Sequence, residues 1–264
     1  MFDLDAYLDR VGLDGRPGLA ELHRAHVASI PFENLDPHRG VPVSLALDDL
    51  ERKLVAGRRG GYCFEQNLLL KAALEALGAR VELILARVRV GAPPGAVRPR
   101  SHLLLRVEHA GATWHADVGF GAGTLLEPIL FGPGAIHEQS SGWRFRVIEE
   151  GAELVLQAEE GGAWLDQYAF LPQPVPPVDV ETSNWFTCTH PRSPFVTGLI
   201  VSSQARDGTR TMLSDWDGVL ELTEQTPAHA SVDVVARGAL PWLLETRFGL
   251  SGFAVGPDGR VVDG

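Results

Sequence analysis

The sequence predicts an α+β fold in which helices come first, antiparallel strands follow and a mixed segment closes the chain. Three observations support this prediction. Apolar residues recur at helical spacing up to residue 78, the period changes to two from residue 81, and strands never alternate with helices as they do in a doubly wound fold. A chain of 264 residues, 45% apolar and 22% charged, is long enough to bury a substantial core.

The N-terminal part is predicted to be helical. Apolar residues fall on one helical face over 19–30 and again over 47–54, where Ser44 is a suitable N-cap. The strongest candidate is 63–77, because it follows two glycines and stops at Gly78, as a helix with a C-terminal glycine does.

Residues 81–170 are predicted to form a meander of antiparallel strands. A strand begins at 81–85, and the segments 101–108 and 113–118 are expected to pair around a turn. Alternating residues and glycine-containing connectors predict further strands, around 143–147, 154–156 and 164. Such a meander is typical of a barrel or a curled sheet.

The C-terminal part is predicted to mix strands and a helix. The segment 171–177 carries four prolines and is expected to be a stiff crossover. Strands are expected near 199–202, 209–213 and 219–222. A final helix is expected over 229–248, broken or kinked by Pro241.

Composition excludes several classes of function. The net charge is −11, which disfavours binding to nucleic acid. No apolar run is long enough to span a membrane, and the first residues lack the features of a signal peptide, so we expect a cytoplasmic protein without a membrane partner. The two cysteines, Cys63 and Cys188, are too few for a disulfide framework.

Cys63 is the candidate nucleophile. It follows Gly60 and Gly61 at the start of the predicted helix, where unpaired N–H groups and the positive helix end favour a thiolate. Arg58 and Arg59 could add positive potential. The alternative is a structural cysteine, since free cysteine is commonly buried as a small apolar residue. Cys188, in Cys-Thr-His, has no zinc-site spacing and is expected to be inert.

A cysteine nucleophile needs a base and a group that orients the base. His102 lies on the strand 101–108, and the expected hairpin pairing sets Asp117 directly opposite it. Asp117 would then fix the tautomer of the ring and stabilise its charged form. The alternatives are a satisfied core histidine and an aspartate that caps a turn. By strand parity His115 is expected to lie nearer to solvent.

These residues belong to a set of motifs by which the chain resembles the arylamine N-acetyltransferases. The motifs occur in the family's order along almost the whole chain: PFENL at 31–35, RGGYCFE at 59–65, Asn67, His102, ADVGFG at 116–121 and SPF at 193–195. The resemblance implies a helical bundle at 1–80, an antiparallel β-barrel at 81–190 and an α/β lid at 191–264, around a catalytic core like that of papain-type proteases.

The resemblance also implies a reaction. Members transfer the acetyl group of acetyl-coenzyme A to arylamines, arylhydroxylamines or hydrazines by a ping-pong route, with Cys63 as nucleophile, His102 as base and Asp117 as orienting acid. Acetyl-coenzyme A is then a co-substrate, no metal is needed, and the protein is a monomer or a homodimer. Glu65 and Asn67 are expected to brace the site by hydrogen bonding.

Gly119, Gly121 and Gly123 are candidate cofactor-binding residues. Alone they are a weak nucleotide-binding signal, and no helix follows them as a dinucleotide-binding fold requires. The resemblance places this loop near the pyrophosphate of coenzyme A, and the alternative is a tight turn.

The alternatives for function stay open at this point. They are an amide synthase of the same superfamily that closes a polyketide onto its own aromatic amine, a papain- or transglutaminase-like hydrolase, and a non-catalytic binding module.

Overall fold

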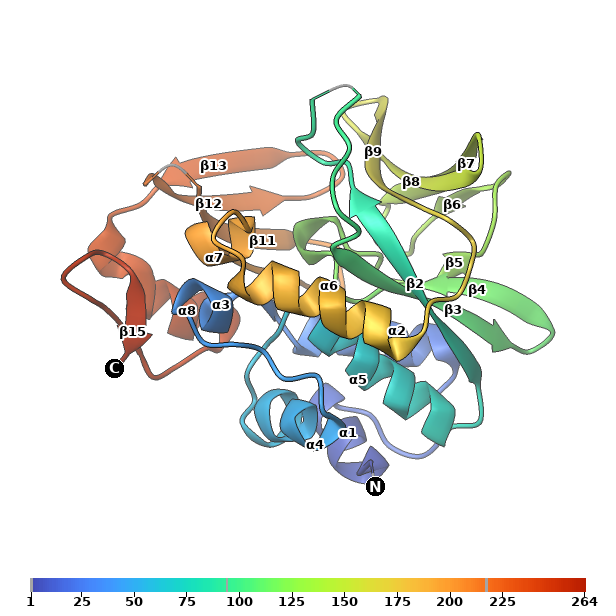
Figure 1. Cartoon of the computed structure of the whole chain (residues 1–264), viewed down its shortest axis with the longest axis horizontal. Coiled ribbons are helices and arrows are strands. Elements are labelled where there is room, and N and C mark those ends of the chain that lie inside the picture. The colour runs from blue at the N-terminus through green and yellow to red at the C-terminus, as the bar shows by residue number, and fades with distance from the viewer. Residues whose placement is uncertain (1, 94, 217) are drawn as a thin grey trace.

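The computed structural model describes residues 2–93, 95–216 and 218–264, and it has the predicted α+β organisation. Helices dominate the N-terminal part, an eight-stranded antiparallel sheet follows, and a five-stranded sheet with further helices completes the chain (Figure 1). Among the described residues, no helix combines the length and apolar character needed to cross a membrane.

The N-terminal part is helical as predicted. Its helices are α1 (Leu4–Val11), α2 (Leu19–Ser29), α3 (Leu35–His38), α4 (Leu47–Leu50), the π-helix η1 (Glu51–Ala56) and α5 (Cys63–Ala76). α2, α4 and α5 occur where the apolar spacing predicts them, whereas that spacing did not single out α1 and α3. α5 confirms the helix predicted at 63–77. The run at 47–54 is helical as predicted, but it widens into a π-helix from Glu51 onward, and Ala46 rather than Ser44 is its N-cap.

The predicted meander forms a barrel-like eight-stranded sheet in the order β5-β4-β3-β2-β9-β8-β7-β6. Its strands are β2 (Arg80–Val88), β3 (His102–His109), β4 (Ala112–Ala116), β5 (Ile129–Leu130), β6 (Ile136–Glu138), β7 (Arg144–Glu150), β8 (Glu153–Glu160) and β9 (Ala163–Phe170). Buried aromatic side chains, including Trp143, Phe145, Tyr168 and Phe170, fill one face of this sheet. α5 packs on strands β2 and β3, which brings its first residue close to the start of β3.

The second sheet joins the two ends of the chain. Its order is β1-β10-β11-β12-β13, made of β1 (Phe32–Glu33), β10 (Leu199–Gln204), β11 (Arg210–Asp215), β12 (Leu220–Gln225) and β13 (Ala230–Val234). Because Phe32 of β1 forms a β-bridge with Gly61, this sheet reaches the segment just before Cys63. The remaining elements are η2 (Gly121–Gly123), α6 (Pro177–Thr189), α7 (Pro194–Thr197), η3 (Arg237–Ala239), α8 (Leu240–Phe248), β14 (Phe253–Val255) and β15 (Val261–Asp263).

The C-terminal helix prediction was wrong in extent. Residues 230–234 form β13, where alternating valines pair with β12, and the helix begins only at Leu240. Pro241 lies in the first turn of α8, where its missing N–H removes no intrahelical bond, so it starts the helix instead of breaking it. α6, which was not predicted, likewise begins at a proline directly after the proline-rich segment.

Candidate active site

Cys63 is the first residue of α5, and its side chain is buried, with the residue 2% exposed. The two glycines before it are required by close approach. A Cβ on Gly60 would lie 2.2 Å from the Pro31 carbonyl oxygen, and one on Gly61 would lie 2.8 Å from Glu65 Oε2. The double glycine therefore lets the chain pass between β1 and the first turn of α5 and start the helix at the thiol.

His102 and Asp117 are hydrogen-bonded, but not as ladder partners. Nε2 of His102 lies 2.7 Å from Oδ2 of Asp117, and both residues are buried. The ladder between β3 and β4 ends at Leu105 and Ala116. Its register, continued, would set His102 opposite Gly119, so the predicted pairing was two residues out. Asp117 follows β4 and reaches the ring from beyond the ladder.

The thiol and the ring lie together. Cys63 Sγ is 3.7 Å from the carbonyl oxygen of Ser101, the residue before His102, and the thiol is close enough to the ring to help raise the pKa of His102. Because Nε2 is engaged by Asp117, Nδ1 is the ring nitrogen left for the sulfur. The structure thus brings together the three residues predicted to act as nucleophile, base and orienting acid.

His102 and Asp117 each stabilise the charged form of the other. Burial alone would lower the pKa of His102, but the Asp117 carboxylate and the contact with Cys63 outweigh burial and raise it to about 10. Burial would raise the pKa of Asp117, yet the His102 ring, the Asn67 amide and the Gly119 N–H hold it well below its usual value. An imidazolium beside the sulfur is the electrostatic condition that a thiolate needs.

Two further side chains are linked to Asp117 by hydrogen bonds, and the sequence pattern identified neither as its partner. The Tyr168 hydroxyl donates to Asp117 Oδ2 at 2.7 Å, and His115 Nε2 lies 2.7 Å from the same hydroxyl. His115 is fully buried, so the parity prediction was wrong: β4 turns this residue to the aromatic interior of the barrel-like sheet, against Tyr168 and Phe170. Burial lowers the pKa of His115 to about 4, so the ring is neutral.

Asn67 acts as predicted for a bracing residue. Its Nδ2 lies 3.0 Å from Asp117 Oδ1 and 2.8 Å from the Leu103 carbonyl, and its Oδ1 accepts from the Val118 N–H. One α5 side chain therefore ties the helix of Cys63 to both strand ends that supply His102 and Asp117.

The three glycines of the loop have different surroundings. A Cβ on Gly119 would lie 2.6 Å from the Cα of Cys63, so this glycine lets the loop pass over α5. Gly121 has a φ of 71°, and Gly123 packs against the Phe120 ring, whose centroid is 4.9 Å from that of His102. Among the described residues no group of histidine, cysteine, aspartate and glutamate side chains is arranged to hold a metal ion.

Comparison with known proteins decides the family. The model of the N-acetyltransferase family matches residues 17–252. The chain belongs to the arylamine N-acetyltransferase family. It is 43% identical over 209 residues to the arylamine N-acetyltransferase of Mycolicibacterium smegmatis, covering 76% of each protein, and 37% identical to that of Mycobacterium tuberculosis, covering 98% of this chain and 93% of the relative. It is therefore an acyltransferase.

Solved structures agree with this family. The arylamine N-acetyltransferase of Mycobacterium marinum in complex with CoA superposes with a TM-score of 0.87 at 36% identity, covering 94% of this chain and 93% of the other. The enzyme of M. smegmatis gives 0.88 at 37% identity, covering 95% and 93%. The motifs by which the sequence resembles the family, PFENL, RGGYCFE and ADVGFG, all meet at the site described above.

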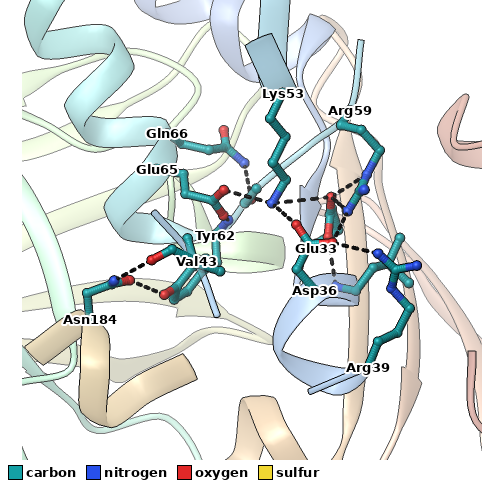
Figure 2. Close-up of polar contacts among 12 residues, drawn as sticks. Glu33, Asp36, Arg39, Val43, Lys53, Arg59, Tyr62, Glu65, Gln66 and Asn184 are labelled. Atoms are coloured by element: carbon teal, nitrogen blue, oxygen red, sulfur yellow. Dashed lines mark hydrogen bonds and ion pairs between the residues drawn. The ribbon is translucent and has the colours of Figure 1, made fainter. Parts of the chain in front are cut away.

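Glu33, Arg59 and Glu65 of these motifs belong to a cluster of charged side chains near the start of α5 in this acyltransferase (Figure 2). Arg59 was expected to add positive potential for the thiol. Its guanidinium instead binds Glu33 Oε1 at 2.7 Å and Asp36 Oδ1 at 3.0 Å, so its charge is neutralised within the cluster. Arg58 is exposed, with a φ of 49°.

Proposed function

We propose that this acyltransferase moves the acetyl group of acetyl-coenzyme A to arylamines, arylhydroxylamines or hydrazines through an acetyl-Cys63 intermediate. The observation that carries the proposal is the position of Cys63. Its thiol lies at a helix start against a buried ring, His102, whose other nitrogen is 2.7 Å from Asp117.

In the first half-reaction the thiol proton resides on His102 and the Cys63 sulfur attacks the carbonyl carbon of the acetyl thioester. The N–H of Cys63 belongs to the first turn of α5 and has no intrahelical acceptor, so it is available to the oxyanion of the tetrahedral intermediate. The bond from carbon to the coenzyme A sulfur then breaks, and the departing thiolate takes the proton from His102. Acetyl-Cys63 and coenzyme A result.

In the second half-reaction the amine nitrogen attacks the carbonyl carbon of acetyl-Cys63. His102 accepts the proton that the nitrogen loses, a step of general base catalysis that typically contributes about 10²–10⁴-fold. The bond from carbon to the Cys63 sulfur breaks, and the N-acetyl product leaves. Asp117 stays ionised throughout and stabilises the charged ring.

The loop after Asp117 is the proposed approach of coenzyme A. Gly121 directly follows Phe120 and Gly123 packs against its ring, and the contact of Phe120 with His102 supports the use of these glycines by the co-substrate. Gly119 is proposed with them, although its contact with Cys63 already accounts for a glycine there. Both cysteines are free thiols, which supports a reducing compartment such as the cytoplasm.

The test is acetylation of the enzyme without an acceptor. We expect acetyl-coenzyme A to release one equivalent of coenzyme A in a burst, with one acetyl group mapped to Cys63 by mass spectrometry, and an added arylamine to discharge it. Cys63→Ser should show no burst, whereas Cys188→Ser should match wild type. Sustained release without acceptor would instead indicate a hydrolase, and absence of any burst would contradict the covalent route.

A further inference from the structure

A compact group of charged side chains lies beside the start of α5 and includes Glu65 of its first turn (Figure 2). We call it the charge cluster, and it holds three carboxylates and three cations: Glu33, Asp36, Glu65, Arg39, Lys53 and Arg59. None of these groups has a role in the proposed reaction. The cluster is nevertheless only two residues from Cys63 through Glu65, which is on the same helix.

Lys53 is at the centre of the charge cluster. Its ammonium nitrogen lies 2.7 Å from Glu65 Oε1, 2.7 Å from Asp36 Oδ2 and 4.0 Å from Glu33 Oε1. Its side chain is 17% exposed. One cation therefore joins the helix of Cys63 to the segment that includes β1 and α3.

The choice of lysine here is unusual for this chain. Only two of its 23 lysine and arginine residues are lysines, Lys53 and Lys71. A compact ammonium can approach three carboxylates from different directions, whereas the planar guanidinium of arginine is suited to binding one carboxylate face to face. The geometry of the cluster thus favours lysine at this position.

The backbone around Lys53 is also unusual. Lys53 lies in the π-helix η1, a rare conformation that occurs often at functional sites. The turn that closes it is tight: the Arg59 N–H donates to the Lys53 carbonyl at 3.0 Å, and a Cβ on Gly57 would lie 2.9 Å from that carbonyl oxygen. The same turn leads directly into Gly60 and Gly61.

Glu65 connects Lys53 to Tyr62, the residue before the thiol. While Oε1 binds Lys53, Oε2 accepts the Tyr62 N–H at 3.1 Å. The carboxylate occupies the space that a side chain on Gly61 would need. A continuous path of contacts therefore runs from Lys53 through Glu65 to the backbone of Tyr62, and the next residue is Cys63.

We propose that Lys53 is a positioning residue that holds the Glu65 carboxylate against the start of α5 and so fixes the place of the Cys63 sulfur beside His102. The proposal rests on the proposed function for its catalytic consequence. Its structural consequence, the reactivity of the Cys63 thiol, can be measured without any acetyl transfer.

The charges around Glu65 give the proposal a signature in pH. Burial raises the pKa of Glu65 to about 7, Lys53 opposes that rise and Glu33 adds to it. The other charged groups of the cluster, Asp36, Arg39 and Arg59, form ion pairs with Lys53, Glu33 or one another and not with Glu65. Removing the ammonium should therefore move the ionisation of Glu65 to higher pH.

The experiment measures the rate at which iodoacetamide alkylates Cys63 across pH 6 to 9 in wild type, Lys53→Met, Glu65→Gln and the double variant. The matched control is Lys71→Met. Lys71 is the other lysine of the chain, and it binds Glu75 at 2.6 Å on α5, the helix of Cys63. Acetyl transfer is followed in the same samples. Lys53→Arg, which keeps the charge, is included in case Lys53→Met fails to fold.

We expect Lys53→Met to lower both the alkylation rate and the acetyl-transfer kcat/KM roughly tenfold, and to move the inflection near pH 7 upward. Glu65→Gln should lose that inflection, the double variant should be no worse than the poorer single variant, and Lys71→Met should match wild type. Unchanged alkylation and pH profile in a folded Lys53→Met protein would overturn the proposal. Loss of transfer in every protein, with the alkylation differences intact, would instead count against the proposed function alone.

Discussion

Tyr168 donates its hydroxyl hydrogen to the same Asp117 oxygen, Oδ2, that accepts from His102. Both donors lie 2.7 Å from that oxygen, and all three side chains are buried. His115 lies 2.7 Å from the hydroxyl on its other side. Since Tyr168 donates to the carboxylate, its oxygen accepts from the neutral His115 ring. Asp117 is thus held by a chain of hydrogen bonds that starts inside the barrel-like sheet.

Tyr168→Phe should therefore lower both activity and stability. The change removes the hydrogen bond to the Asp117 carboxylate, worth about 1.5–3 kcal/mol, and the one that the hydroxyl accepts from His115, and it leaves the ring in place. We expect kcat/KM to fall roughly tenfold. The matched control is Tyr7→Phe, which removes the buried hydrogen bond between Tyr7 and His26 at 2.8 Å and no hydrogen bond of Asp117. A Tyr7→Phe enzyme that loses as much activity at equal stability would contradict a specific role for Tyr168.

Gly119→Ala tests whether the loop glycines serve the backbone or the co-substrate. A Cβ at Gly119 would meet the Cα of Cys63 at 2.6 Å, so the loop or α5 must shift, and we expect a loss of about 3 kcal/mol in unfolding free energy together with loss of Cys63 alkylation. Gly238→Ala is the control, because a Cβ there meets no atom within 4 Å. If Gly119→Ala kept stability and alkylation but raised only the KM for acetyl-coenzyme A, the glycine would serve the co-substrate.

The order and type of most elements were predictable from the sequence, because local patterns determine them. α5 ends where Gly78 predicts, and the connectors between β7, β8 and β9 fall at the predicted glycines. Cys63, His102 and Asp117 could be singled out for a similar reason, since a glycine pair before a cysteine and a histidine strand followed by aspartate are local signals, although the predicted register between His102 and Asp117 was wrong. Sequence periodicity did not indicate that a helix would widen into η1. It also did not indicate that Pro241 would lie at the start of a helix and not in its middle.

The partners of the triad were not predictable, because they depend on contacts between distant strands. Tyr168 is 51 residues from Asp117 and meets it only because the sheet curls. The alternation of side chains along β4 did not show which face of the sheet becomes its interior, so His115 was assigned to the exposed face. The role of Lys53 likewise depends on Asp36 and Glu65, which approach it from two other segments.

The His102–Asp117 pair should make stability depend on pH. The pKa of His102 rises from 6.5 to about 10 on folding, so between these values the folded protein binds more protons than the unfolded chain. The resulting stabilisation is fully present below about pH 6.5 and is lost as the pH rises through about 10, at no more than roughly 1.4 kcal/mol per pH unit. Urea unfolding at several pH values measures it. Asp117→Asn should flatten this decline, and an equally steep decline in that variant would exclude the pair as its source.

Cys63 should react with iodoacetamide at least about tenfold faster than Cys188 near neutral pH. Accessibility does not explain such a difference, because the two residues are 2% and 4% exposed. Their surroundings differ: Cys63 lies at a helix start beside a ring that Asp117 keeps charged, whereas the Cys188 thiol donates to the Trp185 carbonyl within α6. Because the thiolate is the reacting species, the site that stabilises the anion should be labelled first. Peptide mapping by mass spectrometry gives both rates in one sample. Asp117→Asn should slow labelling of Cys63 and leave that of Cys188 unchanged, and equal rates for the two thiols in wild type would remove the basis for assigning Cys63 as the nucleophile.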